Sequence, residues 1–190
     1  MNVALFGGAF DPLHKGHVQL AVNVAQYFDQ VWIVPCYGHK HGKNMTDAQK
    51  RLKICEEGLS SVGNNIFLND FEIVHKITTG TYDSLILFKQ NYPDYNFSVI
   101  IGQDNAETID TWENHKKLTT EFSFVVYPRG LIPSPGAWYL ETPHKYLKDF
   151  LIPPYSSSEI KKLIKKKDFD EVYKMLPNKR VLELAMDFYQ

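Results

Sequence analysis

The chain has 190 residues, of which 44% are hydrophobic and 14% aromatic, and this is enough to bury the core of one domain over residues 1–190. Its formal net charge of −1 offers no general attraction to nucleic acid or to an anionic membrane, so a polyanionic ligand must be held by local donors. No apolar run approaches the roughly 20 residues that cross a bilayer, and the first residues lack a signal-peptide pattern. These features predict a cytoplasmic protein whose two cysteines, Cys36 and Cys55, stay reduced.

Short apolar runs alternate with helical patterns along the chain. The runs predict buried strands at residues 2–6, 31–34, 66–68, 97–101 and 122–126. Amphipathic spacing predicts helices over residues 16–28, 48–59, 81–90, 112–119, 157–166, 168–175 and 180–188. Thr46 and Gln49 are spaced as a capping box for the second helix, and the proline-rich residues 128–143 predict a surface excursion. The alternation predicts an α/β fold, a Rossmann-like doubly wound parallel sheet with a helical C-terminal segment.

The first predicted turn, GGAFDPLHKGH at residues 7–17, carries the strongest local signal. Its two glycines allow a ligand to approach the backbone closely. His14 and His17 fall at the start of the following helix, where free amide groups and the helix dipole favour an anion. In a sheet of this kind, ligands bind beyond the carboxyl ends of the strands, so residues 100–105 (IIGQDN) should face the same crevice.

Residues 7–17, called here the signature segment, resemble the GxFDPxHxGH motif of the HIGH-motif nucleotidylyltransferase superfamily. The rest of the chain is similar to its nicotinate-nucleotide (nicotinamide-nucleotide) adenylyltransferase branch. Four further stretches carry the resemblance: HK at 39–40, which follows the second predicted strand as the family's basic residue does, TGTYDSL at 79–85, IIGQDNAETIDTW at 100–112 and YSSSEIK at 155–161. The GxD and Trp pair favours the nicotinate-nucleotide branch. The last motif departs from the nicotinate-nucleotide branch, because Lys161 stands where that branch has arginine. The pantetheine-phosphate branch also ends its similar motif with lysine.

The resemblance implies one nucleotidylyltransferase domain that transfers the adenylyl group of ATP to nicotinate or nicotinamide mononucleotide, a step of NAD biosynthesis. The 5′-phosphate of the mononucleotide attacks the α-phosphorus and pyrophosphate leaves. This phosphate is already anionic at neutral pH, so catalysis needs positioning and charge stabilisation without a general base. The implied cofactor is Mg²⁺ bound through the ATP phosphates, with no dedicated protein ligand. ATP and the mononucleotide are the expected partners, without nucleic acid or membrane, and a homo-oligomer is left open.

The resemblance also implies roles for particular residues. Catalytic contacts to the phosphates are expected from His14, His17, Lys40 and Lys161. ATP is expected to lie against Gly7, Gly8, Ala9, Phe10, Gly102, Asp104, Ser157 and Ser158. The pyridine ring is expected to stack on Trp112, with Thr81 near its substituent. Asp11, Arg51 and Asp83 are interpreted as mainly structural.

Several alternatives stay open at this stage. Trp112 could be a core residue, Thr81 a helix cap, and Asp104 the cap of the next turn. The same nucleotide site could serve an adenylyltransferase or cytidylyltransferase with another acceptor, such as pantetheine phosphate, or a non-catalytic nucleotide sensor. A zinc site is disfavoured, because the spacing matches no ordinary structural motif; its ligands would be His14, His17, Cys36, His39 and His41.

Overall fold

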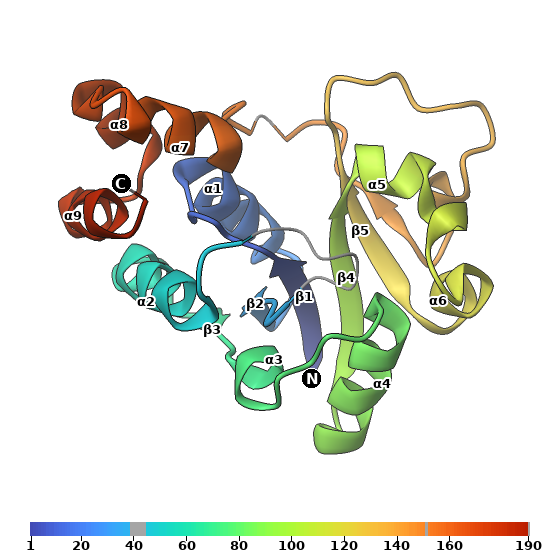
Figure 1. Cartoon of the computed structure of the whole chain (residues 1–190). Helices are drawn as coiled ribbons and strands as arrows, with labels where there is room; N and C mark the ends of the chain where they lie inside the picture. The colour runs from blue at the N-terminus through green and yellow to red at the C-terminus, as the bar shows by residue number, and fades with distance from the viewer. Residues whose placement is uncertain (39–44, 151, 190) are drawn as a thin grey trace.

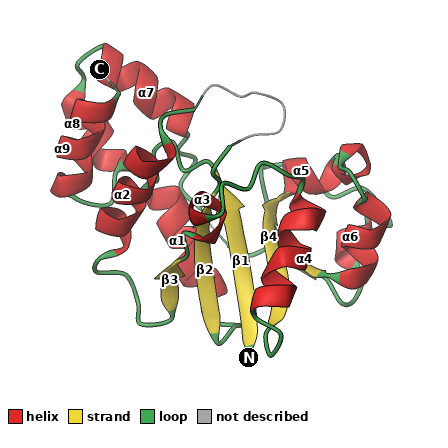
Figure 2. Ribbon diagram, turned by 60° about the horizontal axis from the view of Figure 1, so that its bottom comes forward, coloured by secondary structure: helices red, strands yellow, loops and turns green. Residues whose placement is uncertain are grey.

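The computed structural model describes residues 1–38, 45–150 and 152–189. Its centre is a parallel sheet of six strands in the order β3-β2-β1-β4-β5-β6. Figure 2 shows β3, β2, β1 and β4 side by side. The strands are β1 (Asn2–Gly8), β2 (Gln30–Pro35), β3 (Ile66–Leu68), β4 (Asn96–Gly102), β5 (Ser123–Tyr127) and β6 (Lys145–Tyr146). The order reverses between β1 and β4, which confirms the predicted α/β fold and sets the carboxyl ends of these two strands side by side.

Helices cover both faces of the sheet (Figure 1). The α-helices are α1 (Lys15–Val24), α2 (Ala48–Leu59), α3 (Phe71–Val74), α4 (Thr81–Asn91), α5 (Gln103–Glu107), α6 (His115–Glu121), α7 (Ser157–Lys165), α8 (Phe169–Met175) and α9 (Lys179–Phe188). Two 3₁₀ turns, η1 (Ile109–Thr111) and η2 (Trp138–Leu140), complete the described elements. Helices α1, α2 and α7 to α9 lie on one face, and α3 to α6 lie on the other.

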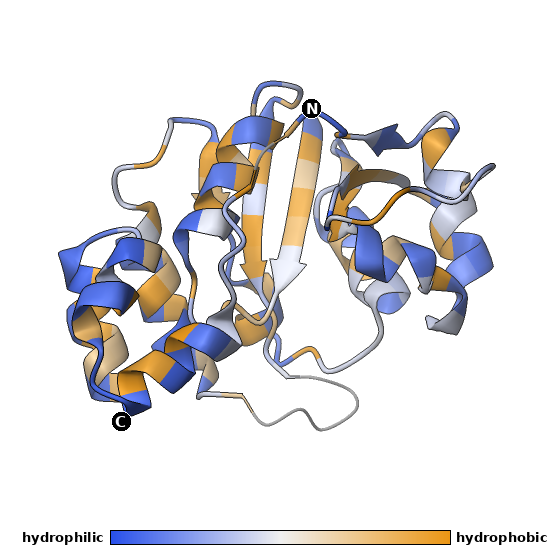
Figure 3. Cartoon of the chain, turned by 90° about the horizontal axis from the view of Figure 1, so that it is seen from above, coloured by the Kyte–Doolittle hydropathy of each residue, from blue (hydrophilic) through white to orange (hydrophobic). Residues whose placement is uncertain are grey.

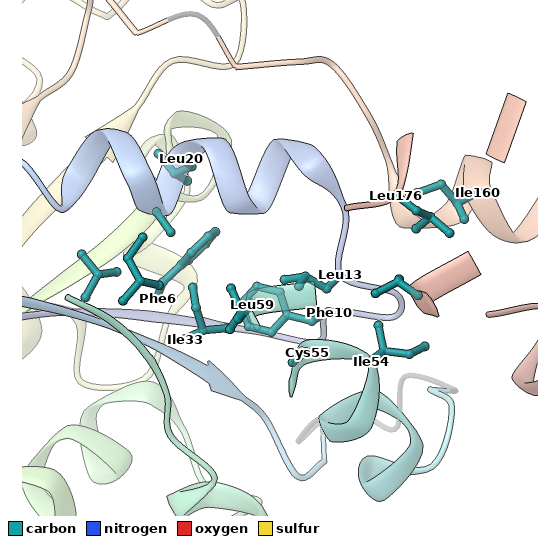
Figure 4. Close-up of a cluster of buried hydrophobic side chains, with 14 of the residues drawn as sticks. Phe6, Phe10, Leu13, Leu20, Ile33, Ile54, Cys55, Leu59, Ile160 and Leu176 are labelled. Atoms are coloured by element: carbon teal, nitrogen blue, oxygen red, sulfur yellow. The ribbon is translucent and has the colours of Figure 1, made fainter. Parts of the chain in front are cut away.

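The alternation of side chains along the strands divides the core into two clusters. Ala4 and Phe6 of β1 belong to the first cluster, beneath α1, α2 and α7 to α9, whereas Val3 and Leu5 belong to the second, beneath α3 to α6. Both sets are apolar, as the hydropathy colours of the central strands show (Figure 3). The first cluster continues into the signature segment, where Phe10 and Leu13 are buried next to Ile54 and Cys55 of α2 (Figure 4).

Several local predictions differ from the structure. The helix predicted over 112–119 begins only at His115, and Trp112 ends the turn η1 instead. The predicted capping box at Thr46 is wrong, because the carboxylate of Asp47 caps α2 by accepting from the backbone N–H of Gln49 and Lys50. β6, α3 and α5 were not predicted, since elements of two to five residues are too short to leave a periodic pattern.

The segment over residues 128–143, predicted to be a surface excursion, lies only partly at the surface. Leu131 and Ile132 are exposed, but Tyr139 within η2 is fully buried against the second core cluster. Its hydroxyl donates to the carboxylate of Glu107 on α5, which anchors the excursion to the helix that follows β4. In the part of the chain that the structure describes, no helix has the length and apolar character needed to span a bilayer.

Candidate active site

The turn that joins β1 to α1 is held from inside the protein. Phe10 adopts a positive φ of 45°, and its ring is buried edge-on against Phe6 with centroids 5.3 Å apart. Beneath the turn, the fully buried guanidinium of Arg51 donates to the carbonyl oxygens of Ala9 and Cys36, each at 2.7 Å. Arg51 thus ties the loops after β1 and β2 together, in agreement with the structural role predicted for it.

His14 and His17 form a stacked pair at the start of α1. Their ring centroids are 3.6 Å apart with an interplanar angle of 19°. The backbone N–H of His14 donates to Nδ1 of His17 at 3.2 Å, so in neutral His17 the proton sits on Nε2. His14 is only 6% exposed, and its Nδ1 has no hydrogen-bond partner within the described residues. The hydrogen bond to Nδ1 therefore leaves Nε2–H as the donor of the His17 ring.

The surroundings keep both imidazoles neutral at physiological pH. Burial, aided by the positive charge of Arg129, lowers the pKa of His14 to about 4. Burial also lowers the pKa of His17 well below its usual range, with further contributions from His14 and Arg129. The pair thus offers N–H donors to an anion without carrying a permanent charge in the free protein.

Arg129 is a site residue that the sequence reasoning missed. It follows β5, and its Nη2 donates to the hydroxyl of Tyr127 at 3.0 Å. Its Nε lies 3.6 Å from Oδ1 of Asp104 in α5, which leaves the predicted ATP residue Asp104 exposed beside a cation. The available signal was its position just past a predicted strand, at the edge of the sheet where ligands bind.

The glycines predicted to border the nucleotide differ in their surroundings. A Cβ on Gly7 would meet no described atom within 4 Å, so its backbone faces open space. A Cβ on Gly8 would lie 3.2 Å from the ring of Phe10, and one on Gly102 would collide with the carboxylate of Asp104. Gly7 is therefore the position with the most room for a ligand to approach the backbone, whereas a side chain at Gly8 or Gly102 would require Phe10 or Asp104 to move.

Helix α7 is joined to the signature segment by two side chains. Lys161 Nζ lies 2.7 Å from Oδ2 of Asp11, and the hydroxyl of Ser157 donates to the carbonyl of Pro12 at 2.9 Å. The N-cap of α7 is Ser156, so the backbone amides of Ser157 and the exposed Ser158 lie in the first turn of the helix. The predicted phosphate residues at both ends of the sequence are thereby brought together.

The two residues predicted to bind the mononucleotide lie near each other on the other side of β1. Thr81 is the first residue of α4, whose N-cap is Gly80, so it is not the helix cap. A Cβ on Gly80 would lie 3.4 Å from Oε2 of Glu113, which places the start of α4 next to the residue that follows Trp112. The indole of Trp112 is half-buried and packs against the second core cluster.

Lys40 lies outside the described residues, as do His39 and His41, so its predicted role stays a prediction. Gly38, the last described residue before that gap, would place a Cβ 3.3 Å from the methyl group of Thr78. The loop after β2 therefore leads toward the segment before α4. In the three described ranges, no group of three His, Cys, Asp or Glu side chains converges to hold a metal ion.

Comparison with known proteins agrees with this arrangement. The Cytidylyltransferase-like family matches residues 5–163. A "Probable nicotinate-nucleotide adenylyltransferase" from Bacillus cytotoxicus is 33% identical over 151 residues, which cover 77% of this chain and 76% of the relative. One from Fusobacterium nucleatum is 32% identical over 133 residues, which cover 68% of each chain.

A solved structure extends the similarity over nearly the whole chain. Plasmodium falciparum nicotinic acid mononucleotide adenylyltransferase, complexed with NaAD, superposes with a TM-score of 0.83 at 25% identity. The match covers 98% of this chain and 95% of that one. The chain therefore belongs to the Cytidylyltransferase-like family, in its nicotinate-nucleotide adenylyltransferase branch.

Proposed function

We propose that the protein transfers the adenylyl group of ATP to nicotinate mononucleotide and releases pyrophosphate, as a step in NAD biosynthesis. The observation that carries this proposal is the stacked His14–His17 pair at the start of α1, which follows the turn that begins at the open backbone of Gly7. The names of the relatives and the NaAD complex of the Plasmodium neighbour support the same reaction. The substrates are small soluble nucleotides, and we infer a cytoplasmic location.

The transfer is an in-line displacement at the α-phosphorus of ATP. A 5′-phosphate oxygen of the mononucleotide forms the new P–O bond, and the bond to the β-phosphate oxygen breaks. The Nε2–H of His17 and the imidazole of His14 donate to the α-phosphoryl oxygens, where negative charge shifts during the transfer. Preorganised donors of this kind stabilise the transition state without having to reorganise during the reaction.

The leaving pyrophosphate needs positive charge and N–H donors. Lys161 and Lys40 supply the charge, and the amides of Ser157 and Ser158 in the first turn of α7 supply donors. The backbone of Gly8, Ala9 and Phe10 lies along the nucleotide, and Asp104 accepts from a ribose hydroxyl. Mg²⁺ carried in with ATP would neutralise part of the triphosphate charge.

The acceptor lies on the side of Thr81 and Trp112. The half-exposed face of the Trp112 indole stacks on the pyridine ring, and Thr81 lies near the carboxyl substituent. Stacking of a base on an aromatic side chain contributes about 1–3 kcal/mol and does not depend on a particular hydrogen-bond pattern. The preference for the acid over the amide therefore has to come from donors near the substituent.

The test is an acceptor panel. The purified chain is incubated with Mg²⁺, ATP and nicotinate mononucleotide, nicotinamide mononucleotide or pantetheine phosphate, and pyrophosphate release is followed with product identification. We expect the highest kcat/KM with nicotinate mononucleotide. Turnover only with pantetheine phosphate, or only with CTP in place of ATP, would replace the proposal by one of the alternative reactions. Nucleotide binding without turnover on any acceptor would indicate a sensor.

A further inference from the structure

Asp11 is a buried carboxylate in the middle of the signature segment. Its residue is 4% exposed, yet Oδ2 is 2.7 Å from Nζ of Lys161 and 3.4 Å from the backbone N of Thr46. Burial by itself raises the pKa of Asp11, but the hydrogen bonds from Lys161 and Thr46 outweigh it and keep the pKa below its usual range. Asp11 is therefore a fixed negative charge inside the protein.

Lys161 reaches this carboxylate from α7, 150 residues along the chain. About a third of its side chain, 32%, stays exposed, so the ammonium lies between the buried carboxylate and the surface. An ammonium has three N–H donors. One donor is used on Asp11, which leaves two for oxygens of a ligand that approaches from the exposed side.

Tyr189, which follows α9, completes the cluster. It is 6% exposed, and the ammonium of Lys161 lies 6.0 Å from the centroid of its ring. Burial and the neighbouring charge of Asp11 raise the pKa of Tyr189, so its hydroxyl stays protonated. The lysine is thus bordered by a carboxylate from the signature segment and by an aromatic ring from the far end of the described chain.

We propose that Asp11 and Tyr189 are positioning residues that hold the Lys161 ammonium toward the triphosphate. This inference rests on the proposed function, in which Lys161 contacts the leaving pyrophosphate. A lysine on its four-carbon stem has many rotamers, and fixing it only when ATP binds would cost conformational entropy. The buried carboxylate removes much of that freedom before ATP arrives, which matters more for a lysine than for an arginine, whose planar guanidinium can hold two oxygens at once.

A simpler role for Lys161 makes a different prediction. If the lysine only neutralises Asp11, its removal harms the protein by leaving a buried carboxylate without a counter-charge. Removal of both charges would then restore normal behaviour. If Lys161 also contacts the phosphates, the double variant stays impaired. The pair can therefore be tested by a double-mutant cycle.

The experiment compares the parent with Asp11→Asn, Lys161→Ala and the double variant, and Lys162→Ala serves as the control. Lys162 carries the same charge at the next position of α7 and is exposed. Measured quantities are kcat, KM for ATP, the melting temperature, and the dissociation constant of a non-hydrolysable ATP analogue.

We expect kcat/KM for ATP to fall about 100-fold in Lys161→Ala and roughly tenfold in Asp11→Asn. The double variant should be no worse than Lys161→Ala, although its melting temperature should be higher, and the control should stay within about twofold of the parent.

Two kinetic results would overturn the positioning role of Asp11. Parent-like kcat/KM in the double variant would mean that Lys161 serves only as a counter-charge. If Asp11→Asn lowers kcat/KM by the same factor in the parent and in the Lys161→Ala variant, Asp11 acts independently of Lys161. If the parent shows no adenylyl transfer, the proposed function fails, but the same cycle in the dissociation constant of the ATP analogue still decides the positioning role.

Tyr189 provides a second test that keeps both charges of the ion pair and that applies even if Asp11→Asn does not fold. Tyr189→Phe keeps the ring and should stay within about threefold of the parent in KM for ATP. Tyr189→Leu removes the ring and should raise that KM roughly fivefold in the Lys161 protein but not in the Lys161→Ala background. A Tyr189→Leu effect of the same size in both backgrounds would overturn the positioning role of Tyr189.

Discussion

The proposed phosphate half of the site, formed by the signature segment and the start of α7, is held by interior contacts, whereas the proposed acceptor half at Thr81 and Trp112 is partly exposed. Asp11 and His14 are 4% and 6% exposed, and side chains of α2 and α7 tie their segment down. Helix α4, by contrast, starts at Thr81 after the N-cap Gly80, which supplies no side-chain hydrogen bond to the first turn. From this difference we expect the transfer reaction to depend on hydrogen-bond donors held in fixed positions by the interior. We expect the choice of acceptor to depend on partly exposed side chains, which can be substituted with less effect on the core.

The largest expected effect comes from the preorganised half. His17→Ala should lower kcat by about 10²–10³, because a donor aimed at the transferring phosphoryl group acts mainly in the transition state. The dissociation constant of a non-hydrolysable ATP analogue should change much less. Steady-state kinetics and analogue titration measure the two quantities, and an unchanged kcat would remove His17 from the catalytic group.

Substitutions in the acceptor half should weaken binding of the mononucleotide and change kcat little. Trp112→Ala should raise KM for the mononucleotide roughly 5- to 100-fold, the range expected for a lost stacking contact, and should leave KM for ATP nearly unchanged. Since uniform binding is lost, kcat should move little. If the variant instead melts at a lower temperature with parent-like kinetics, Trp112 is only a core residue.

Gly7→Ala probes whether a ligand occupies the open space at the end of β1. An added methyl group meets no described protein atom within 4 Å, so the melting temperature should be equal to that of the parent or slightly higher. Close contact with the nucleotide should nevertheless raise KM for ATP about 3- to 10-fold. Gly130→Ala is the matched control, because Gly130 lies within residues 128–143 at a positive φ of 73°. This variant should have a lower melting temperature than the parent and an unchanged KM for ATP.

The smallest effect is a proton uptake that reports on the histidine pair. In the free protein the pKa of His14 is about 4 and that of His17 is also depressed, so both are neutral at pH 6. A triphosphate beside them favours the charged form and raises these pKa values, so binding should take up protons. The stacked rings disfavour a second charge, which limits the uptake to less than about one proton. Calorimetry at pH 6 in two buffers of different ionisation enthalpy measures it, and no uptake would place the triphosphate elsewhere.

Local patterns predicted much of the fold. The buried strands are runs of β-branched and aromatic residues, and helix α2 begins and ends at Ala48 and Leu59 as its amphipathic spacing predicts. Trp112 shows the limit of such patterns. Its neighbours suit a helix, but the chain makes a 3₁₀ turn first because Ile109 packs into the second core cluster and α6 starts only at His115.

The sequence by itself determined the signature segment and the alternation of strands and helices, because each depends on residues close together in the chain. Only the tertiary structure decided which distant side chains meet. Arg129 beside Asp104, and Lys161 on Asp11, are contacts made by packing β5 against β4 and α7 against the signature segment. Lys161 and the carboxylate of Asp11 are 150 residues apart, so their pairing leaves no local pattern in the sequence. The two residues meet because burial of the surrounding core brings α7 against the signature segment.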